Sequence, residues 1–146
     1  MTLVCRDLSE VGMTALIDNA AFRLIRSVTP GPYTFILKAR RSLPRRLQHS
    51  RRRTIGFRIP DNCIALALLE SLGEPLLSSS LVLPGNDTPE TDPAEIYRVL
   101  GARVDVVVDA GPGSTEMTTV IDLTGDVPVV ARSGKGDIAW MGKSAS

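Results

Sequence analysis

The sequence predicts an α/β domain with a twisted sheet of mixed parallel and antiparallel strands and flanking helices. Two observations lead to this fold class. Short runs rich in β-branched and aromatic residues, typical of strands, alternate with segments whose apolar residues recur at helical spacing. The alternation has no regular strand–helix–strand period, which favours both strand directions within one sheet over a purely parallel sheet.

The length of 146 residues is typical of one domain with a sizeable core, so we expect a single domain over residues 1–146. An apolar content of 43% and a charged content of 23% are ordinary for a globular protein. No apolar run reaches the roughly 20 residues that span a bilayer, so no membrane partner is expected. The start, "MTLVCRDLSE", lacks the features of a signal peptide, which leaves the cytoplasm as the expected location.

The strands are expected where apolar, β-branched and aromatic residues cluster between turn residues. In chain order these runs are "TLVC" (2–5), "YTFILK" (33–38), "TIGFRI" (54–59), "PLLSSSLVL" (75–83), "VDVVVDA" (104–110), "TTVIDL" (118–123) and "PVVARSG" (128–134). The segment "TPGPYTFIL" leads into the second run through two prolines. Because no side chain of this Pro-Gly-Pro turn has ionisable chemistry, we expect its role to be architectural.

Three helices are expected between these strands. The first, "DNAAFRLIRSV", has an apolar stripe, with Asp18 or Asn19 as its N-cap, and the following Thr-Pro-Gly stops it. The second, "NCIALALLESLG", is apolar nearly all round, which predicts a well-buried helix that ends at Gly73. The third, "DPAEIYRVLG", contains a capping-box pattern with Asp92 as N-cap and Glu95 at the third helical position.

The side chains of nucleophilic and metal chemistry are sparse. Cys5 and Cys63 have no second Cys or His at ligand spacing, so zinc is not expected and both are predicted to be small buried hydrophobes. His49 is the only histidine, and a catalytic triad is therefore improbable. The segment "SGKGD" lacks the first glycine and the final Ser or Thr of a phosphate loop. No catalytic side chain and no metal site are predicted.

Hydroxyls and arginines do occur at strand ends. Ser78, Ser79 and Ser80 interrupt an apolar strand, Thr118 opens another, and Arg58 and Arg132 close two more. In open α/β sheets ligands bind where strand ends converge, and an arginine fork matches a carboxylate or phosphate. This pattern indicates an anion-binding domain. The alternative is that both arginines are surface ion-pair partners.

Charge is distributed unevenly. Residues 38–58 hold nine of the 17 Lys and Arg and no Asp or Glu, although the net charge is only +1. The stretch is either a solvated loop between two strands or a patch that attracts the phosphates of RNA or of a nucleotide. The patch residues are Arg40, Arg41, Arg45, Arg46, Arg51, Arg52 and Arg53.

Five segments in order carry a resemblance to a known family: "TPGPYTFILKA", "RRRTIGFRIPDN", "GEPLLSSSLVLPG", "VDVVVDAG" and "TTVIDLTGDVPVVARSGKGD". They resemble the YrdC/YciO family of threonylcarbamoyl-AMP synthase-like proteins, and within it the YciO branch. The resemblance implies a YrdC-like twisted sheet around a positively charged cavity. It also implies a nucleotidyltransferase that converts L-threonine, bicarbonate and ATP into threonylcarbamoyl-AMP and pyrophosphate, for threonylcarbamoyladenosine modification of tRNA.

The resemblance also implies roles for single residues. Arg58, Ser78 and Thr118 match the threonine side of the family's site. The nucleotide side is matched by Thr54, Ser80, Thr88 and Arg132, with Arg132 on the phosphates of ATP. Mg²⁺ is the implied companion of ATP. The alternative function is a binding module for double-stranded RNA or the ribosome that uses the stretch from Arg40 to Arg58.

Two departures from the family pattern set a further expectation. Family members carry several dozen residues before the point that matches Met1, so relative to the family the domain is expected to be truncated at its N-terminus, either because the start of the gene is misplaced or because the chain is a natural fragment without synthase activity. Synthases read Ser-x-Ser-Ala-Asn in the serine strand, where this chain has Leu81 and Val82 in place of Ala-Asn, and it has Pro84 in place of a later Ser. Both departures predict impaired synthase activity for the chain as given.

Overall fold

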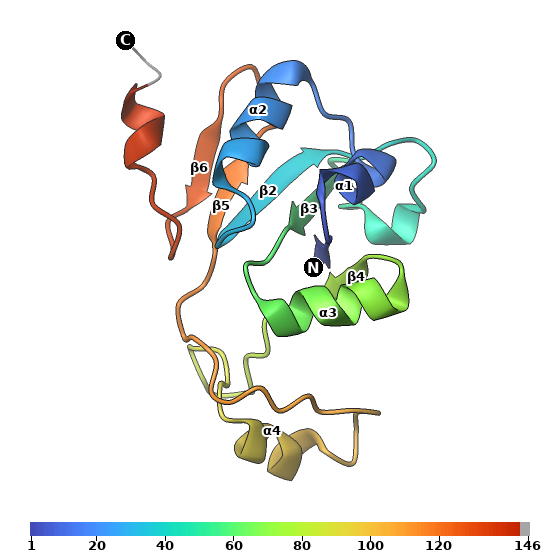
Figure 1. The fold of residues 1–146 in the computed structure, drawn as a ribbon, viewed down its shortest axis with the longest axis vertical. Coiled ribbons are helices and arrows are strands. Elements are labelled where there is room, and N and C mark those ends of the chain that lie inside the picture. Colours follow the sequence, from blue (N-terminus) through green and yellow to red (C-terminus); the bar gives the residue numbers. More distant parts are fainter. Residues whose placement is uncertain (144–146) are drawn as a thin grey trace. The chain divides into compact units, whose positions relative to one another are not determined.

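The computed structural model describes residues 1–143, and its centre is a six-stranded sheet (Figure 1). Two compact units are distinguished: Ser79–Met117 forms one, and the segments before and after it form the other, which holds the sheet. In chain order the elements are β1 (Thr2–Val4), α1 (Leu8–Thr14), α2 (Asn19–Val28), β2 (Tyr33–Lys38), η1 (Arg45–Leu47), β3 (Thr54–Arg58), α3 (Cys63–Leu72), β4 (Leu76–Ser78), α4 (Pro93–Leu100), β5 (Thr119–Asp122), β6 (Val129–Arg132) and η2 (Ala139–Lys143).

The strand order across the sheet is β4-β1-β3-β2-β5-β6. The β1–β3 and β2–β5 pairs are parallel, and the other three pairs are antiparallel. The predicted mixed sheet with flanking helices is thus confirmed.

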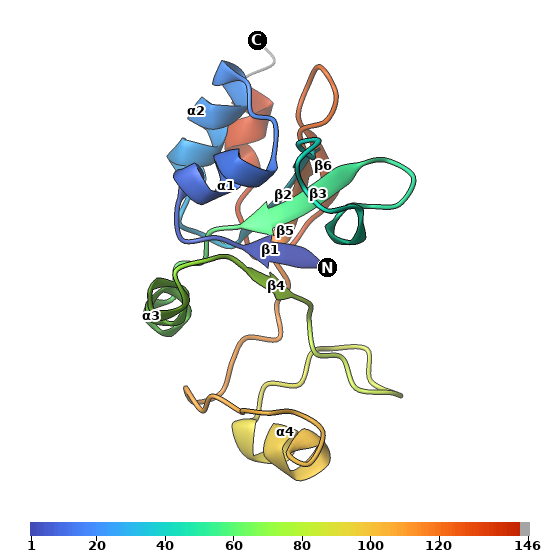
Figure 2. The same cartoon turned by 90° about the vertical axis from the view of Figure 1, so that its right-hand side faces the viewer.

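The core lies between one face of the sheet and helices α1 and α2, which Figure 2 shows on the same side of the strands. Phe35 and Phe57 are cross-strand partners in the centre of this face, with ring centroids 5.7 Å apart, and both are fully buried. Val11 of α1 and Ile25 of α2 pack into the same cluster. Burial of such side chains contributes about 1.5–3 kcal/mol each, which makes this layer the main source of stability.

The predicted helix boundaries agree with the cap geometry. The Asp18 carboxylate accepts the backbone N–H of Ala21 at 2.7 Å and caps α2, while the Asn62 side chain caps α3. Gly73 ends α3 with φ at +72°, a conformation that glycine adopts without a steric penalty. The short helix α1 was not among the expected elements. Asp7 caps it by accepting the N–H of Glu10.

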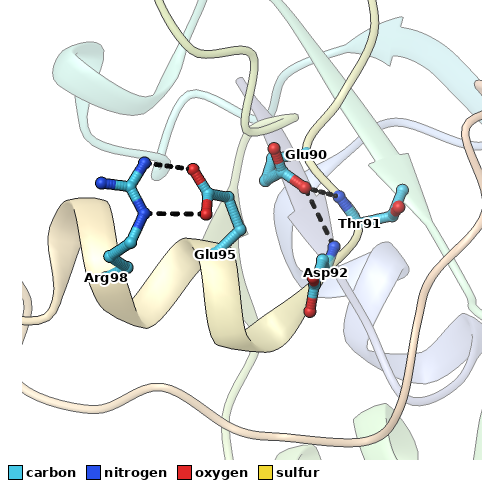
Figure 3. A network of polar contacts seen from close by, with 5 residues as sticks. All are labelled: Glu90, Thr91, Asp92, Glu95 and Arg98. Carbon is cyan, nitrogen blue, oxygen red and sulfur yellow. Dashed lines mark hydrogen bonds and ion pairs between the residues drawn. The ribbon is translucent and has the colours of Figure 1, made fainter.

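Helix α4 begins as expected, but the capping box is built differently (Figure 3). Asp92 accepts the N–H of Ala94 at 3.0 Å, as an N-cap should. Glu95 turns away from the cap and pairs with Arg98 one turn later. The upstream Glu90 takes the expected place, accepting the N–H groups of Thr91 and Asp92 at 2.9 and 3.0 Å.

Four expectations, two about burial and two about strands, are wrong. Helix α3 is not well buried: Ile64, Leu68 and Leu72 are exposed, and Leu69 is its one buried residue. Cys63, at the start of this helix, is exposed, whereas Cys5 is buried as expected.

The segment 104–110 is not a strand, and Val106 and Val108 are exposed. The serine run 75–83 keeps strand structure only at Leu76–Ser78. The local pattern is satisfied in both segments, but within the described residues no strand pairs with 104–110, and only Leu76–Ser78 of the serine run pairs with β1.

Candidate functional site

The face of the sheet opposite α1 and α2 carries the polar side chains of the strands. Side chains alternate along a strand, so the neighbours of buried Phe35 and Phe57 point away from the core. A Cβ placed on Gly56 would lie 3.7 Å from Thr2 Oγ1 and 3.7 Å from Thr34 Cγ2, which shows that these three residues share the face. Since Arg58 lies two residues beyond Gly56 on β3, it also belongs to this face.

Arg58, on this face, has a side chain that lacks a hydrogen-bond partner in the described part of the chain. Its Nε is buried and has no hydrogen-bond partner among the described residues. Burial lowers the pKa of the Arg58 guanidinium below its ordinary value, and the group still carries its charge at neutral pH. A buried guanidinium N–H without an acceptor is costly, and a carboxylate or phosphate would relieve that cost.

Thr34, Thr118 and Arg132 form a network at the same end of the sheet. The Thr34 and Thr118 hydroxyl oxygens are 2.7 Å apart and share a hydrogen bond. Arg132 donates from Nε and Nη2 to the Thr118 carbonyl oxygen at 3.2 and 2.9 Å, and from Nη2 to Thr118 Oγ1 at 3.3 Å. The arginine therefore fixes both the backbone and the side chain of Thr118.

Strand direction explains why these residues meet. Strands β3 and β6 run in the same direction, so their carboxyl ends, with Arg58 and Arg132, lie at the same end of the sheet. Strands β2 and β5 run the opposite way, so their amino ends, with Thr34 and Thr118, lie at that end too. Arg58, Thr118 and Arg132 thus lie at one end of the strands, as predicted.

The other predicted site residues lie elsewhere. Thr54 is at the far end of β3, paired with Lys38. Ser78 lies on the edge strand β4, pairs with Thr2 of β1 and donates its hydroxyl to the Thr2 carbonyl oxygen at 3.2 Å. Ser80 and Thr88 are exposed and belong to the unit Ser79–Met117. The roles of all these residues stay predictions.

Sequence reasoning missed Thr34 and Gly56. The signal was present in "YTFILK" and "TIGFR", because a Thr or Gly between buried aromatic or branched residues faces the other side of the sheet. Thr119, the next residue along from Thr118, faces the core side instead. Its hydroxyl donates to the Gly136 carbonyl oxygen at 2.7 Å and accepts the Gly134 N–H at 3.1 Å. These bonds hold the segment after β6 against β5.

The basic stretch forms the connection between β2 and β3. Its seven predicted patch arginines are exposed, and no ion pair involves them in the described part of the chain. RNA binding by this patch stays a prediction. Among residues 1–143, no three His, Cys, Asp or Glu side chains come together as a metal site would require. No helix within the same range is long and apolar enough to cross a membrane.

Comparisons with known proteins identify relatives of this chain. The family model Sua5_yciO_yrdC, described as "Telomere recombination", matches residues 1–134. The chain is 55% identical over 137 residues to YciO of Escherichia coli, covering 94% of this chain and 66% of that protein. A threonylcarbamoyl-AMP synthase of Bacillus subtilis is 30% identical over 130 residues, covering 88% of this chain and 37% of the synthase.

Solved structures show the same fold. The crystal structure of E. coli YciO matches with a TM-score of 0.89 at 54% identity, over 94% of this chain and 67% of that one. Sua5 of P. abyssi, solved in complex with L-threonine, matches with a TM-score of 0.86 at 25% identity, over 97% of this chain and 42% of Sua5. The chain thus spans about two thirds of the length of YciO. On this evidence the chain belongs to the Sua5/YciO/YrdC family.

Proposed function

We propose that this chain binds L-threonine at Arg58 and provides part of the site of a threonylcarbamoyl-AMP synthase-like nucleotidyltransferase. The observation that carries the proposal is the buried Arg58 Nε without a partner. A neutral ligand would leave this charge unmatched, whereas an α-carboxylate accepts from the guanidinium in the bidentate manner that arginine favours. The P. abyssi relative solved with L-threonine, and the relatives named as synthases, support the choice of amino acid.

The neighbouring hydroxyls suit the rest of the amino acid. Thr34 and Thr118 share one hydrogen bond and keep further acceptor capacity for an ammonium or a hydroxyl. Arg132 holds Thr118 in place through three contacts. In this proposal Arg132 positions Thr118, and the rest of its exposed guanidinium is free to meet a phosphate, as the family resemblance implies.

The chemistry asks mainly for positioning. The threonine amine combines with bicarbonate to give a carbamate and water. A carbamate oxygen then bonds to the α-phosphorus of ATP while the bond from that phosphorus to pyrophosphate breaks. Holding the carboxylate at Arg58 fixes the amine relative to the incoming groups, and such positioning supplies much of the rate enhancement in reactions of this kind. ATP enters as its Mg²⁺ complex, with Thr54, Ser80 and Thr88 as the proposed nucleotide contacts.

The test separates binding from turnover. Threonine binding is measured by calorimetry on the folded chain, and pyrophosphate release from ATP is measured with and without threonine and bicarbonate. Both are repeated on the longest in-frame gene product that contains the chain. Arg58→Lys keeps the charge but removes the fork, so threonine binding should weaken about tenfold or more, as expected for a lost charge-assisted hydrogen bond.

The matched control is Arg46→Lys, an exposed arginine of the basic stretch. It should leave threonine binding unchanged. The proposal would be contradicted if Arg58→Lys and Arg46→Lys weakened threonine binding equally. It would also be contradicted if neither the wild-type chain nor the longer gene product, both folded, bound threonine. Threonine binding without pyrophosphate release, in the longer product as well as in the chain itself, would support the Arg58 site and assign the loss of activity to the altered serine strand.

A further inference from the structure

The connection between β2 and β3 borders an open pocket that the proposed function does not use. The pocket has a volume of about 290 Å³ and is lined by Ala39, Arg40, Arg41, Arg45, Gln48 and Arg53. Four of these six residues carry a guanidinium. The teal connection in Figure 1 leaves the sheet at the Lys38–Thr54 end of β2 and β3.

This connection is anchored along its length, unlike a freely solvated loop. At its base, Ala39 N–H donates to the Arg53 carbonyl oxygen at 2.9 Å, and Arg40 N–H donates to the Thr14 carbonyl oxygen at 2.9 Å. Leu43 is buried in the main core. The Gln48 amide donates to the Leu43 carbonyl oxygen at 2.6 Å and so closes the loop over this anchor.

One pocket arginine is held by its side chain, and another has an uncommon backbone conformation. Arg40 Nε donates to the Gly12 carbonyl oxygen at 2.6 Å, which ties its guanidinium to α1. Arg53 has φ at +52°, in the left-handed region that a side chain other than glycine enters at a cost. Such an outlier persists only where the surroundings enforce it, and it is more frequent at ligand sites.

The positive charge of the pocket is not matched by the protein. The stretch from Lys38 to Arg58 contains no Asp or Glu. The ion pairs in the described residues involve only Arg6 and Arg98 on the basic side, so none of the four pocket arginines has a carboxylate partner there. Four guanidinium groups around one small pocket repel one another, and an anion of high charge removes that repulsion.

We propose that this pocket binds a small compound with two or more linked phosphates. A single phosphate monoester carries a charge of about −1.5 to −2, less than four arginines can neutralise, whereas an oligophosphate chain matches them. The volume is at the lower limit of ordinary ligand pockets and suits such a chain. The pocket is distinct from the proposed threonine and nucleotide site. Its Arg40 is tied to α1 on the core side of the sheet, whereas Thr54 and Arg58 alternate with the buried residues of β3 and face the opposite side.

The test is calorimetry with inorganic triphosphate at 0.15 M salt, roughly physiological ionic strength, on the wild type and a matched pair of variants. Arg45 and Arg46 are neighbours in η1, but only Arg45 lines the pocket. Arg45→Gln should weaken triphosphate binding about tenfold, because one charge-assisted contact is lost. Arg46→Gln removes the same charge from the same helix and should change the affinity less than twofold.

Arg53→Gly adds a control for folding. Glycine accepts the positive φ without strain, so this variant should unfold at the same temperature as the wild type or higher while binding triphosphate more weakly. Arg58→Lys should leave triphosphate binding unchanged. Loss of triphosphate binding in Arg58→Lys would place the phosphates in the threonine-side site and overturn the pocket.

Two further results would overturn the inference. One is equal weakening by Arg45→Gln and Arg46→Gln, which indicates a diffuse charge effect. The other is binding of an RNA duplex, with steep salt dependence, by a folded protein that does not bind triphosphate. Inorganic phosphate serves as the comparison ligand, and it should bind more weakly than triphosphate.

Discussion

Replacing Arg58 by methionine should make the protein more stable while removing its threonine site. Methionine has a similar length and fills the same space without the buried N–H that lacks an acceptor. An unsatisfied buried polar group costs about 1–3 kcal/mol. Because Arg58 is only partly buried, we take the lower end, a gain of about 1 kcal/mol. For a chain of this size that corresponds to a rise of about 3 °C in the unfolding temperature.

The comparison is Arg132→Met, the same substitution at the same edge of the sheet. Arg132 makes three contacts to Thr118, so its loss should lower stability, by less than about 1 kcal/mol because the side chain is exposed. Thermal unfolding followed by circular dichroism measures both variants, and calorimetry measures threonine binding. An Arg58→Met variant that is less stable than the wild type would refute the reasoning, because Arg58 would then have a stabilising partner.

Three other predictions concern the fold. Gly136→Ala should destabilise the folded protein by about 1–3 kcal/mol through overpacking, because its Cβ would lie 2.5 Å from Cε1 of the buried Tyr33 ring. Gly125→Ala should be nearly neutral, because the nearest atom to its Cβ is 4.0 Å away. Equal unfolding temperatures of the two variants would contradict this prediction. Burial, with smaller effects of Glu10 and Asp7, raises the pKa of Cys5 from 9.0 to about 12. Stability should therefore fall as the pH rises from about 9 towards 12, because the unfolded thiol ionises first, and Cys5→Ala should flatten this part of the pH profile. Asp92→Ala should lower the hydrogen-exchange protection of the first turn of α4 by about 1 kcal/mol, whereas Glu95→Gln should leave it unchanged. A larger loss of protection in Glu95→Gln than in Asp92→Ala would contradict this prediction and indicate that Glu95 caps the helix.

The sequence was informative wherever a feature depends on a few adjacent residues. The caps at Asp18 and Asp92 and the left-handed end at Gly73 follow from local backbone chemistry, and all are present. The strands at 33–38 and 54–58 follow from β-branched and aromatic residues in the same way. Their order in the sheet does not follow from such patterns, and the mixed direction was inferred only from the absence of a regular period.

The features that were predicted wrongly or not at all depend on contacts between distant segments of the chain. The apolar surface of α3 predicts burial, yet the sequence does not say what packs against each side, and Ile64 and Leu68 remain exposed. The valines of 104–110 satisfy a strand pattern without a strand to pair with. The packing of Tyr33 against Gly136 joins residues far apart in the chain, and no local pattern indicates it.

The candidate site was predictable in part for the same reason. Arginines and hydroxyls at strand ends are visible in the sequence, and three of them, Arg58, Thr118 and Arg132, do reach one edge of the sheet. Thr34, which hydrogen-bonds to Thr118, was not predicted because it lies within an apolar strand segment and not at its end. The pocket arginines were recognised as a basic run, but which of them face one another depends on how the connection folds.

The most direct test of the account follows the Arg58 Nε–H signal by nuclear magnetic resonance during a titration with L-threonine. The free protein should show this N–H without an acceptor, and threonine should move the signal strongly downfield as the carboxylate binds. Threonine methyl ester, which lacks the charged carboxylate, should not move it. If the signal stays in place while threonine binds elsewhere, or if the ester moves it equally, Arg58 is not the carboxylate site and the account is wrong.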